Sequence, residues 1–225
     1  MRPEGIRAVV FDLDGTLIDS RRDLAEAVNR MRGELGLDSL ALAEVVGMVG
    51  RGARNLVRSA LGGEPDEARL DRALASFLVH YDEVATDATL PYPGVSRLLV
   101  ELAAARPLAL LTNKPERPTR RILDHFGWSG LFREVIGGDS LPVRKPDPGG
   151  LAEIARRLGV APAELLLVGD SPIDARTAAA AGSPFVFAEW GFAPPGADEE
   201  LGDAWRARDA ESLRRFLARG VPAIQ

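Results

Sequence analysis

The chain has 225 residues, 46% of them apolar, and a formal net charge of −5, so it can bury a sizeable core as one large domain or as a core with an insert. Its mild acidity argues against nucleic acid as the main partner, and the lack of cysteine excludes disulfides and thiol chemistry. Because no apolar run approaches membrane-spanning length, we expect a soluble cytoplasmic protein without a membrane partner.

The first predicted element is a buried strand at residues 8–11, an apolar run that ends in two acids. Asp12 and Asp14 stand two residues apart where the chain turns, so both carboxylates can face one crevice, and Gly15 permits the tight backbone. Carboxylates this close repel each other unless a cation lies between them or one is protonated. Both conditions suit phosphoryl transfer, in which Mg²⁺ takes oxygen ligands, one carboxylate is the nucleophile and another carries a proton. An isolated pair is equally well explained as a strand-end turn with capping Asp residues.

A helical insert is predicted to follow this strand. Apolar residues recur at helical spacing, and the expected helices cover residues 20–35, 41–46, 53–60 and a longer stretch from Pro65. The first helix is expected to start with a capping box at Ser20 and Asp23, and residues 47–52 form a glycine-rich loop. Since no strand is predicted within residues 18–88, we expect an all-helical unit at 18–89, inserted into a core formed by 1–17 and 90–225.

From residue 90 onward, strands and helices alternate. Strands are predicted at residues 108–111, 134–136, 165–168 and 185–187, the last of these being the last strand of the chain. Helices fill the intervals, and a final helix is expected at residues 210–218. This alternation predicts an α/β fold with a doubly wound parallel sheet.

Polar residues follow several of the predicted strands. In open α/β sheets, ligands bind outside the carboxyl ends of the strands. Asp12, Thr112 and Asp170 each fall at such an end, and Lys145 lies in a loop just before a helix. Lys145 and Lys114 are the only lysines among 28 basic residues, which makes both better functional candidates than lysines usually are. Separate stretches thus supply polar groups to one edge of the sheet, which predicts a site there.

Four motifs occur in order along the chain: Asp12-Leu13-Asp14-Gly15-Thr16, then Thr112-Asn113, then Lys145-Pro146, then Gly169-Asp170-Ser171 with Asp174. Together they resemble the motifs of the haloacid dehalogenase-like (HAD) superfamily, most closely those of phosphoglycolate phosphatases with a helical cap. The resemblance covers nearly the whole chain. It implies a Rossmann-like sheet core, a small helical cap at residues 18–89, and Mg²⁺-dependent hydrolysis of a small phosphorylated metabolite.

The resemblance also implies a role for each motif residue. Asp12 would attack the phosphorus and form an aspartyl-phosphate, and Asp14 would protonate the leaving oxygen and then deprotonate the attacking water. Lys145 would supply positive charge to the transferring phosphoryl group. Mg²⁺ would be held by Asp12, the backbone carbonyl of Asp14 and Asp170. Asp174 would contact the metal ligands without binding the ion directly, or would bind it through water. Alternatively, Asp174 only stabilises the N-terminal turn of its helix through the helix dipole.

Several further residues keep two interpretations. Thr112 and Asn113 would offer a hydroxyl and an amide to the phosphate oxygens, or else cap a helix after the strand. Lys114 lines the substrate end or caps the turn. His80 and His125 lie inside predicted helices and are interpreted as structural. The aromatic residues of the stretch 190–192 could border the cleft, but packing is the favoured interpretation.

Substrate choice is expected to come from the helical insert. Arg51, on the glycine-rich loop, could hold the carboxylate of 2-phosphoglycolate in a bidentate fork. Alternatively, Arg51 and Arg54 are exposed surface arginines. On the first hypothesis, Arg51→Ala raises KM for carboxylated substrates more than for neutral sugar phosphates.

Other functions stay open at this point. The substrate could be N-acetylmuramate 6-phosphate, another sugar phosphate, pyrophosphate or a nucleotide, and a β-phosphoglucomutase-like phosphomutase would use the same core. A dehalogenase lacks the second aspartate, and a phosphonatase needs a cap lysine that residues 18–88 do not contain. A non-catalytic phosphate-binding module would be expected to have lost one of the motif residues. We expect a monomer or a homodimer.

Overall fold

The computed structural model describes residues 5–193, 201 and 204–218 of the chain. Its main feature is a six-stranded sheet with the strand order β5-β4-β1-β6-β7-β8, in which all pairs are parallel. The strands are β1 (Ala8–Phe11), β4 (Leu108–Leu111), β5 (Phe132–Ile136), β6 (Leu165–Gly169), β7 (Phe185–Ala188) and β8 (Trp205–Ala207). The predicted parallel α/β fold is therefore confirmed.

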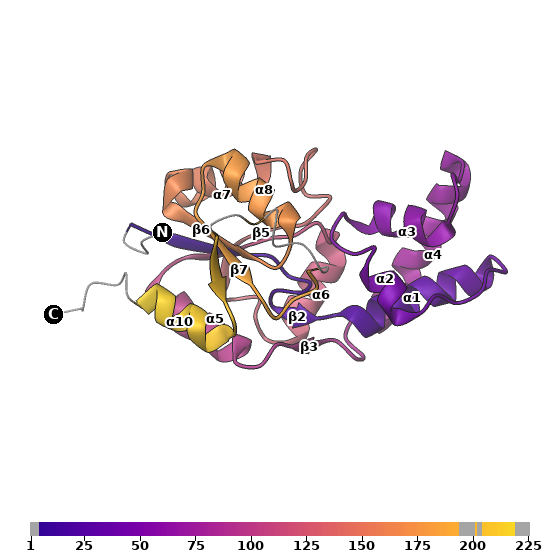
Figure 1. The fold of residues 1–225 in the computed structure, drawn as a ribbon, viewed down its shortest axis with the longest axis horizontal. Coiled ribbons are helices and arrows are strands. Elements are labelled where there is room, and N and C mark those ends of the chain that lie inside the picture. The colour runs from indigo at the N-terminus through magenta and orange to yellow at the C-terminus, as the bar shows by residue number, and fades with distance from the viewer. Residues whose placement is uncertain (1–4, 194–200, 202–203, 219–225) are drawn as a thin grey trace.

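The central strand β1 is buried on both faces because all four of its residues are apolar. Val9 and Phe11 face one hydrophobic cluster, and Ala8 and Val10 face the other, as the alternation of a strand requires. The helices α5 (Val95–Ala105), α6 (Glu116–His125) and α10 (Ala210–Ala218) cover the first face, and α7 (Gly149–Leu158) and α8 (Pro172–Ala181) cover the second, as Figure 1 shows. A short 3₁₀ turn, Pro162–Glu164, leads into β6.

The first four helices after β1 form the helical insert, named here as residues 21–84: α1 (Arg21–Glu34), α2 (Leu42–Val46), α3 (Ala53–Leu61) and α4 (Glu67–Val84). They lie to the right of the sheet in Figure 1. Helix α4 begins at the N-cap residue Asp66, whose carboxylate accepts a hydrogen bond from the Arg69 backbone. Apolar residues at helical spacing, such as Val28, Met31 and Phe77, bury their side chains between the helices. The predicted helices are confirmed.

The connection between insert and sheet corrects two predictions. Residues 18–88 do contain a strand, because β2 (Ile18–Asp19) pairs antiparallel with β3 (Leu90–Pro91). Two residues are too short for an alternating pattern, so the sequence did not reveal this ribbon. The capping box is also absent, because Ser20 makes no capping hydrogen bond and its hydroxyl donates to Asp14 instead. Asp23 accepts hydrogen bonds from the backbones of Ala88 and Thr89 and from the Thr89 hydroxyl.

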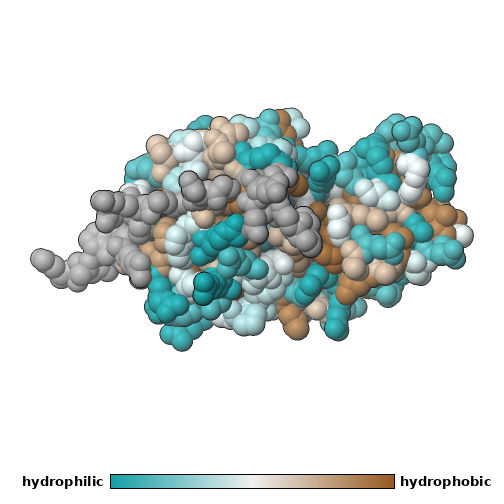
Figure 2. Space-filling view, viewed as in Figure 1, coloured by the Kyte–Doolittle hydropathy of each residue, from teal (hydrophilic) through white to brown (hydrophobic). Residues whose placement is uncertain are grey.

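The prediction that residues 185–187 are the last strand is wrong as well. Strand β8 follows and pairs with β7, Val186 opposite Trp205 and Ala188 opposite Ala207. Its three residues Trp-Arg-Ala carry no recognisable apolar pattern, so only the edge position next to β7 makes them a strand. On the face shown in Figure 2, the outline narrows between the sheet on the left and the helical insert on the right. Among the described residues, no helix is both long and apolar enough to cross a membrane.

Candidate active site

Three buried carboxylates converge where β1 and β6 end side by side. Asp12 follows β1, Asp170 follows β6, and Asp174 lies in the first turn of α8. One oxygen of each lies within 4.8 Å of the others. Asp174 is fully buried and Asp170 is 2% exposed, so neither carboxylate is screened by water. The convergence predicted from the strand ends therefore occurs for Asp12 and Asp170, and Asp174 joins them from the first turn of α8.

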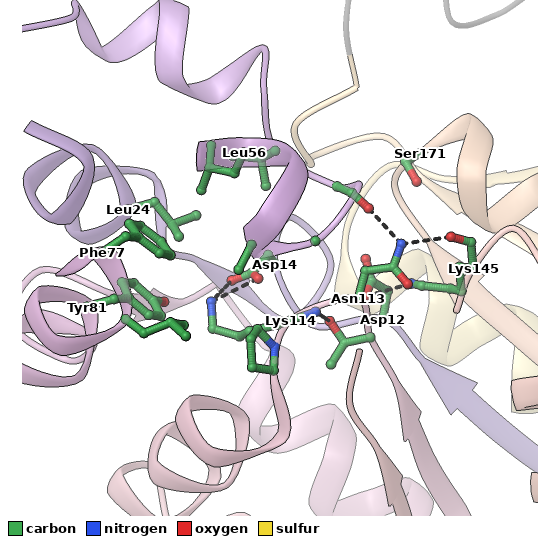
Figure 3. A pocket seen from close by; sticks show the side chains of 17 residues that line it. Asp12, Asp14, Leu24, Leu56, Phe77, Tyr81, Asn113, Lys114, Lys145 and Ser171 are labelled. Atoms are coloured by element: carbon green, nitrogen blue, oxygen red, sulfur yellow. Dashed lines mark hydrogen bonds and ion pairs between the residues drawn. The ribbon is translucent and has the colours of Figure 1, made fainter. Parts of the chain in front are cut away.

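Lys145 provides the positive charge closest to this cluster. Its Nζ lies 2.8 Å from Asp12 Oδ1 (Figure 3) and 2.6 Å from Asp174 Oδ1, and the residue is only 5% exposed. Burial disfavours the charged ammonium, but Asp12 and Asp174 outweigh burial and raise the pKa of Lys145 above its usual range. Lys145 is thus a permanently charged member of the site and not a solvated surface lysine.

The Asp170 carboxylate is fixed by hydrogen bonds from two other segments of the chain. Its two oxygens accept hydrogen bonds from the Thr16 hydroxyl at 3.1 Å and from the Phe192 backbone at 2.6 Å. Two glycines make room for it, because a Cβ on Gly15 would lie 2.1 Å from Asp170 Oδ2 and a Cβ on Gly191 would lie 2.2 Å from Asp170 Cβ. The stretch 190–192 therefore does more than pack: its backbone fixes an acid of the site, a role that the side chains in the sequence did not signal.

The donor set fits a divalent cation with a preference for oxygen ligands. Burial raises the pKa of Asp12 to about 6, with repulsion from Asp174 adding to burial and Lys145 opposing both. Burial, then repulsion from Asp12 and Asp174, raises the pKa of Asp170 well above its usual range. Among the described residues, Lys145 is the cation paired with two of the three carboxylates, Asp12 and Asp174. A further positive charge at this point would stabilise the ionised acids, and carboxylate oxygens are the ligands that Mg²⁺ prefers.

Asp14 faces the same cavity but has different partners. Lys114 Nζ lies 2.9 Å from both of its carboxylate oxygens (Figure 3). The Ser20 hydroxyl donates to Oδ1. Lys114 is buried, and although burial disfavours its charge, Asp14 and Tyr81 raise the pKa of Lys114 above its usual range. Of its two predicted positions, Lys114 takes the one that lines the cavity.

Thr112 and Asn113 lie at the end of β4 and also line this cavity. The Thr112 hydroxyl oxygen accepts a hydrogen bond from the Lys114 backbone at 3.2 Å, so its own hydrogen stays available for a ligand. The N-cap residue of α6 is Pro115 and not Thr112 or Asn113, so the alternative that these two cap the helix is wrong.

The Asn113 amide connects the sheet edge to the glycine-rich loop of the insert. Its nitrogen donates to the carbonyl of Gly50 and to the carbonyl of Lys145, each at 2.9 Å (Figure 3). Both amide hydrogens are used in this way. Asn113 therefore holds the loop 50–52 against the loop of Lys145, in addition to its position in the cavity wall.

The remaining candidates are exposed or lie outside the cavity. Arg51 is exposed and lines an opening that Asp12, Asp14 and Asp170 also line, whereas Arg54 forms surface ion pairs with Glu67 and Asp71. His80 bonds to a glutamate of α1, and His125 is exposed near the end of α6. The two histidines do not line the cavity.

Comparisons with known proteins agree with this arrangement. The sequence model of haloacid dehalogenase-like hydrolases matches residues 6–182. A phosphoglycolate phosphatase from Pseudomonas putida is 45% identical over 192 residues, which cover 83% of this chain and 70% of that protein. A phosphoglycolate phosphatase from Rhodospirillum rubrum is 41% identical over 194 residues, covering 83% of this chain and 80% of that protein.

A solved structure gives the same result for the fold. The crystal structure of a predicted phosphoglycolate phosphatase from Haemophilus somnus superposes with a TM-score of 0.88 at 30% sequence identity, covering 94% of this chain and 98% of that one. The match extends over both the sheet and the helical insert, since only a small part of either chain is left out. This chain belongs to the haloacid dehalogenase-like hydrolase family.

Proposed function

We propose that this protein is a Mg²⁺-dependent phosphatase that hydrolyses a small phosphomonoester, with 2-phosphoglycolate as the leading substrate. The observation that carries the proposal is the buried Asp12–Lys145 pair at the carboxyl end of β1, which opens onto a cavity that Asp14 and Thr112 also line. The relatives named phosphoglycolate phosphatase support the choice of substrate. The cytoplasmic location and the monomeric or homodimeric state stay predictions.

In the first chemical step, Asp12 attacks the phosphorus and the ester oxygen leaves with the proton of Asp14. Two of the three Lys145 donors go to Asp12 and Asp174, which leaves one for a phosphoryl oxygen. The free hydrogen of the Thr112 hydroxyl serves a second phosphoryl oxygen. These fixed donors act where negative charge accumulates, in a site with little water. The product of this step is an aspartyl-phosphate and a neutral alcohol.

In the second step, water attacks the aspartyl-phosphate while Asp14 accepts a proton from that water. Free phosphate leaves and the Asp12 carboxylate is restored. Asp14 thus gives one proton to the leaving oxygen in the first step and regains one from water in the second. Ser20 and Lys114 fix the orientation of Asp14 for both transfers. We assign to residues 18–89 the role of a cap that controls which leaving group and which water molecules reach Asp14.

The residues that would hold Mg²⁺ are Asp12, Asp170 and the backbone carbonyl of Asp14. Asp174 would act behind them, because its oxygens already accept hydrogen bonds from Lys145 and Ser171. When bound, the ion supplies positive charge that offsets repulsion between the carboxylate nucleophile and the anionic phosphate.

The test is phosphate release from 2-phosphoglycolate, sugar phosphates and pyrophosphate, with and without Mg²⁺. Asp12→Asn keeps the shape of the side chain but removes the nucleophile, and Asp38→Asn on the exposed surface of the insert is the matched control. We expect Mg²⁺-dependent release that Asp12→Asn lacks and Asp38→Asn retains, and a phosphate adduct on the acid-quenched wild type. An isomerised sugar phosphate in place of free phosphate would instead identify a mutase, and release by Asp12→Asn at the wild-type rate would exclude this mechanism.

A further inference from the structure

The cavity at Asp12 and Asp14 extends under the helical insert. It provides about 50 Å³ of space there, and a second opening of about 240 Å³ shares Asp12 and Asp14 with it.

The insert side of this cavity is almost entirely apolar. Leu24 of α1, Leu56 of α3 and Phe77 of α4 form the wall seen on the left of Figure 3, with the ring of Tyr81 stacked on Phe77 at a centroid distance of 5.7 Å. Of the described insert residues that line the cavity, Tyr81 alone carries a polar side-chain atom. Sugar hydroxyls placed against this wall would lose their hydrogen bonds to water without replacement.

Two buried donors lie next to each other at the end of this wall. Lys114 uses two of its three donors on Asp14, and its Nζ lies 4.4 Å from the centroid of the Tyr81 ring. Tyr81 is 2% exposed, and among the described residues its hydroxyl has no hydrogen-bond partner. A buried polar group without a partner is costly, and a ligand that accepts from it is one explanation for its presence.

We propose that Lys114 and Tyr81 form a subsite for a carboxylate on the leaving group, so that the substrates are 2-phospho-carboxylic acids. A carboxylate has two oxygens, one for the free donor of the ammonium and one for the phenol. This inference rests on the proposed phosphatase function and deepens it. It assigns carboxylate recognition to Lys114 in place of Arg51, because Lys114 is buried and paired with Asp14, whereas Arg51 is exposed.

The first test compares 2-phosphoglycolate with ethyl phosphate, which has the same two carbons but no carboxylate. The selectivity ratio is kcat/KM for 2-phosphoglycolate divided by kcat/KM for ethyl phosphate. Lys114→Met lowers this ratio by roughly 10- to 100-fold, the range expected for hydrogen bonds to a charged group. Tyr81→Phe removes one neutral donor and lowers the ratio by roughly 3- to 10-fold. Tyr92→Phe is the matched control, since among the described residues its buried hydroxyl also has no partner but lies outside this cavity.

The ratio separates substrate recognition from the support that Lys114 gives Asp14, because that support acts on both esters alike. Equal losses on the two esters in Lys114→Met and in Tyr81→Phe would overturn the proposal. The proposal would also be overturned if Arg51→Ala lowered the ratio of the two kcat/KM values and Lys114→Met left it at the wild-type value. Tyr81→Phe deletes a single oxygen, so it decides the question if Lys114→Met does not fold.

A second measurement needs no turnover. Calorimetric titration of Asp12→Asn with 2-phosphoglycolate and with ethyl phosphate gives the preference for the carboxylate as a ratio of Kd values. We expect Tyr81→Phe and Lys114→Met in this background to lower the Kd of ethyl phosphate divided by the Kd of 2-phosphoglycolate. Absence of hydrolysis with the binding preference intact would reject the phosphatase function and keep the subsite, whereas an unchanged binding ratio in both variants would reject the subsite.

Discussion

The two walls of the cavity differ in how they are built. On the sheet side, charged groups follow the ends of β1, β4 and β6, and their carboxylates are tied to Lys145 or to backbone donors. On the insert side, leucine and aromatic side chains from three helices present an apolar surface with a single hydroxyl, that of Tyr81. The first wall contacts what every phosphate ester shares, and the second contacts what differs between esters. Chemistry therefore depends on the sheet wall, and selectivity on the insert wall together with Lys114, which follows β4 and contacts both Asp14 and Tyr81.

The largest expected effect comes from breaking the sheet wall at Lys145, the buried cation paired with Asp12 and Asp174. Lys145→Met keeps the length of the side chain but leaves Asp12 and Asp174 without their partner. We expect kcat to fall by roughly 10³-fold or more, because a charge directed at the phosphoryl group is lost.

Stability should fall in the same variant, by about 3 kcal/mol, since removing one partner of a buried ion pair leaves an uncompensated charge. Steady-state kinetics and urea unfolding measure the two effects. Lys145→Met combined with Asp174→Asn restores part of the stability but none of the activity. A double variant as active as the wild type would show that Lys145 only balances Asp174.

The second prediction concerns the backbone support of the sheet wall. Gly191→Ala places a methyl group against Asp170, where the present backbone leaves space only for hydrogen. Displacing an acid that is expected to ligate Mg²⁺ should raise the Mg²⁺ concentration for half-maximal activity by roughly 10- to 100-fold. Gly130→Ala is the matched control, because its Cβ meets no atom of the described structure within 4 Å. An unchanged Mg²⁺ requirement in Gly191→Ala would show that Asp170 is not a ligand.

The third prediction addresses how the two walls are held together. Asp23 accepts hydrogen bonds from the Ala88 and Thr89 backbones, which fixes the return of the chain from the insert to the sheet. Asp23→Ala leaves these donors without an acceptor and should lower the free energy of unfolding by about 2 kcal/mol. We also expect a several-fold higher KM for 2-phosphoglycolate, because the insert wall shifts against Asp14. The control Asp66→Ala removes the α4 cap and should lower stability by about 1 kcal/mol without changing KM.

The smallest effect is expected on the outer surface of the insert. Arg54 pairs with Glu67 and Asp71 across exposed helix faces, and exposed ion pairs contribute little. Arg54→Ala should keep kcat/KM within about twofold and shift the melting temperature by no more than about 2 °C. A tenfold change in kcat/KM would place Arg54 in the substrate path.

The fold and the sheet wall could be predicted from the sequence because both rest on local patterns. Apolar runs such as residues 8–11 and 165–168 become strands regardless of their neighbours, and acids that follow parallel strands must meet at one edge. The strands β2 and β8 could not be predicted, because a strand of two or three residues exists only through its partner.

The insert wall was harder to predict for a related reason. The helical periodicity of α1 and α4 shows that Leu24, Phe77 and Tyr81 face inward, but not that this interior adjoins Asp14. Ser20 and Asp23 look like a capping box in sequence, yet their side chains bond to Asp14 and to residues 88–89. Distant partners of this kind leave no mark on the sequence around a residue.

The β2–β3 ribbon has a consequence for how this architecture tolerates change. The chain leaves the sheet at Ile18 and returns at Pro91, and these two residues are directly opposite each other in the ribbon. Everything between them can therefore be viewed as one long hairpin loop grafted onto a two-residue stem. Loops whose ends are already adjacent can be exchanged, shortened or lengthened at little entropic cost to the rest of the chain. A phosphate-handling core with this stem could accept a different module at the same two positions and acquire a different leaving group without rebuilding its catalytic edge.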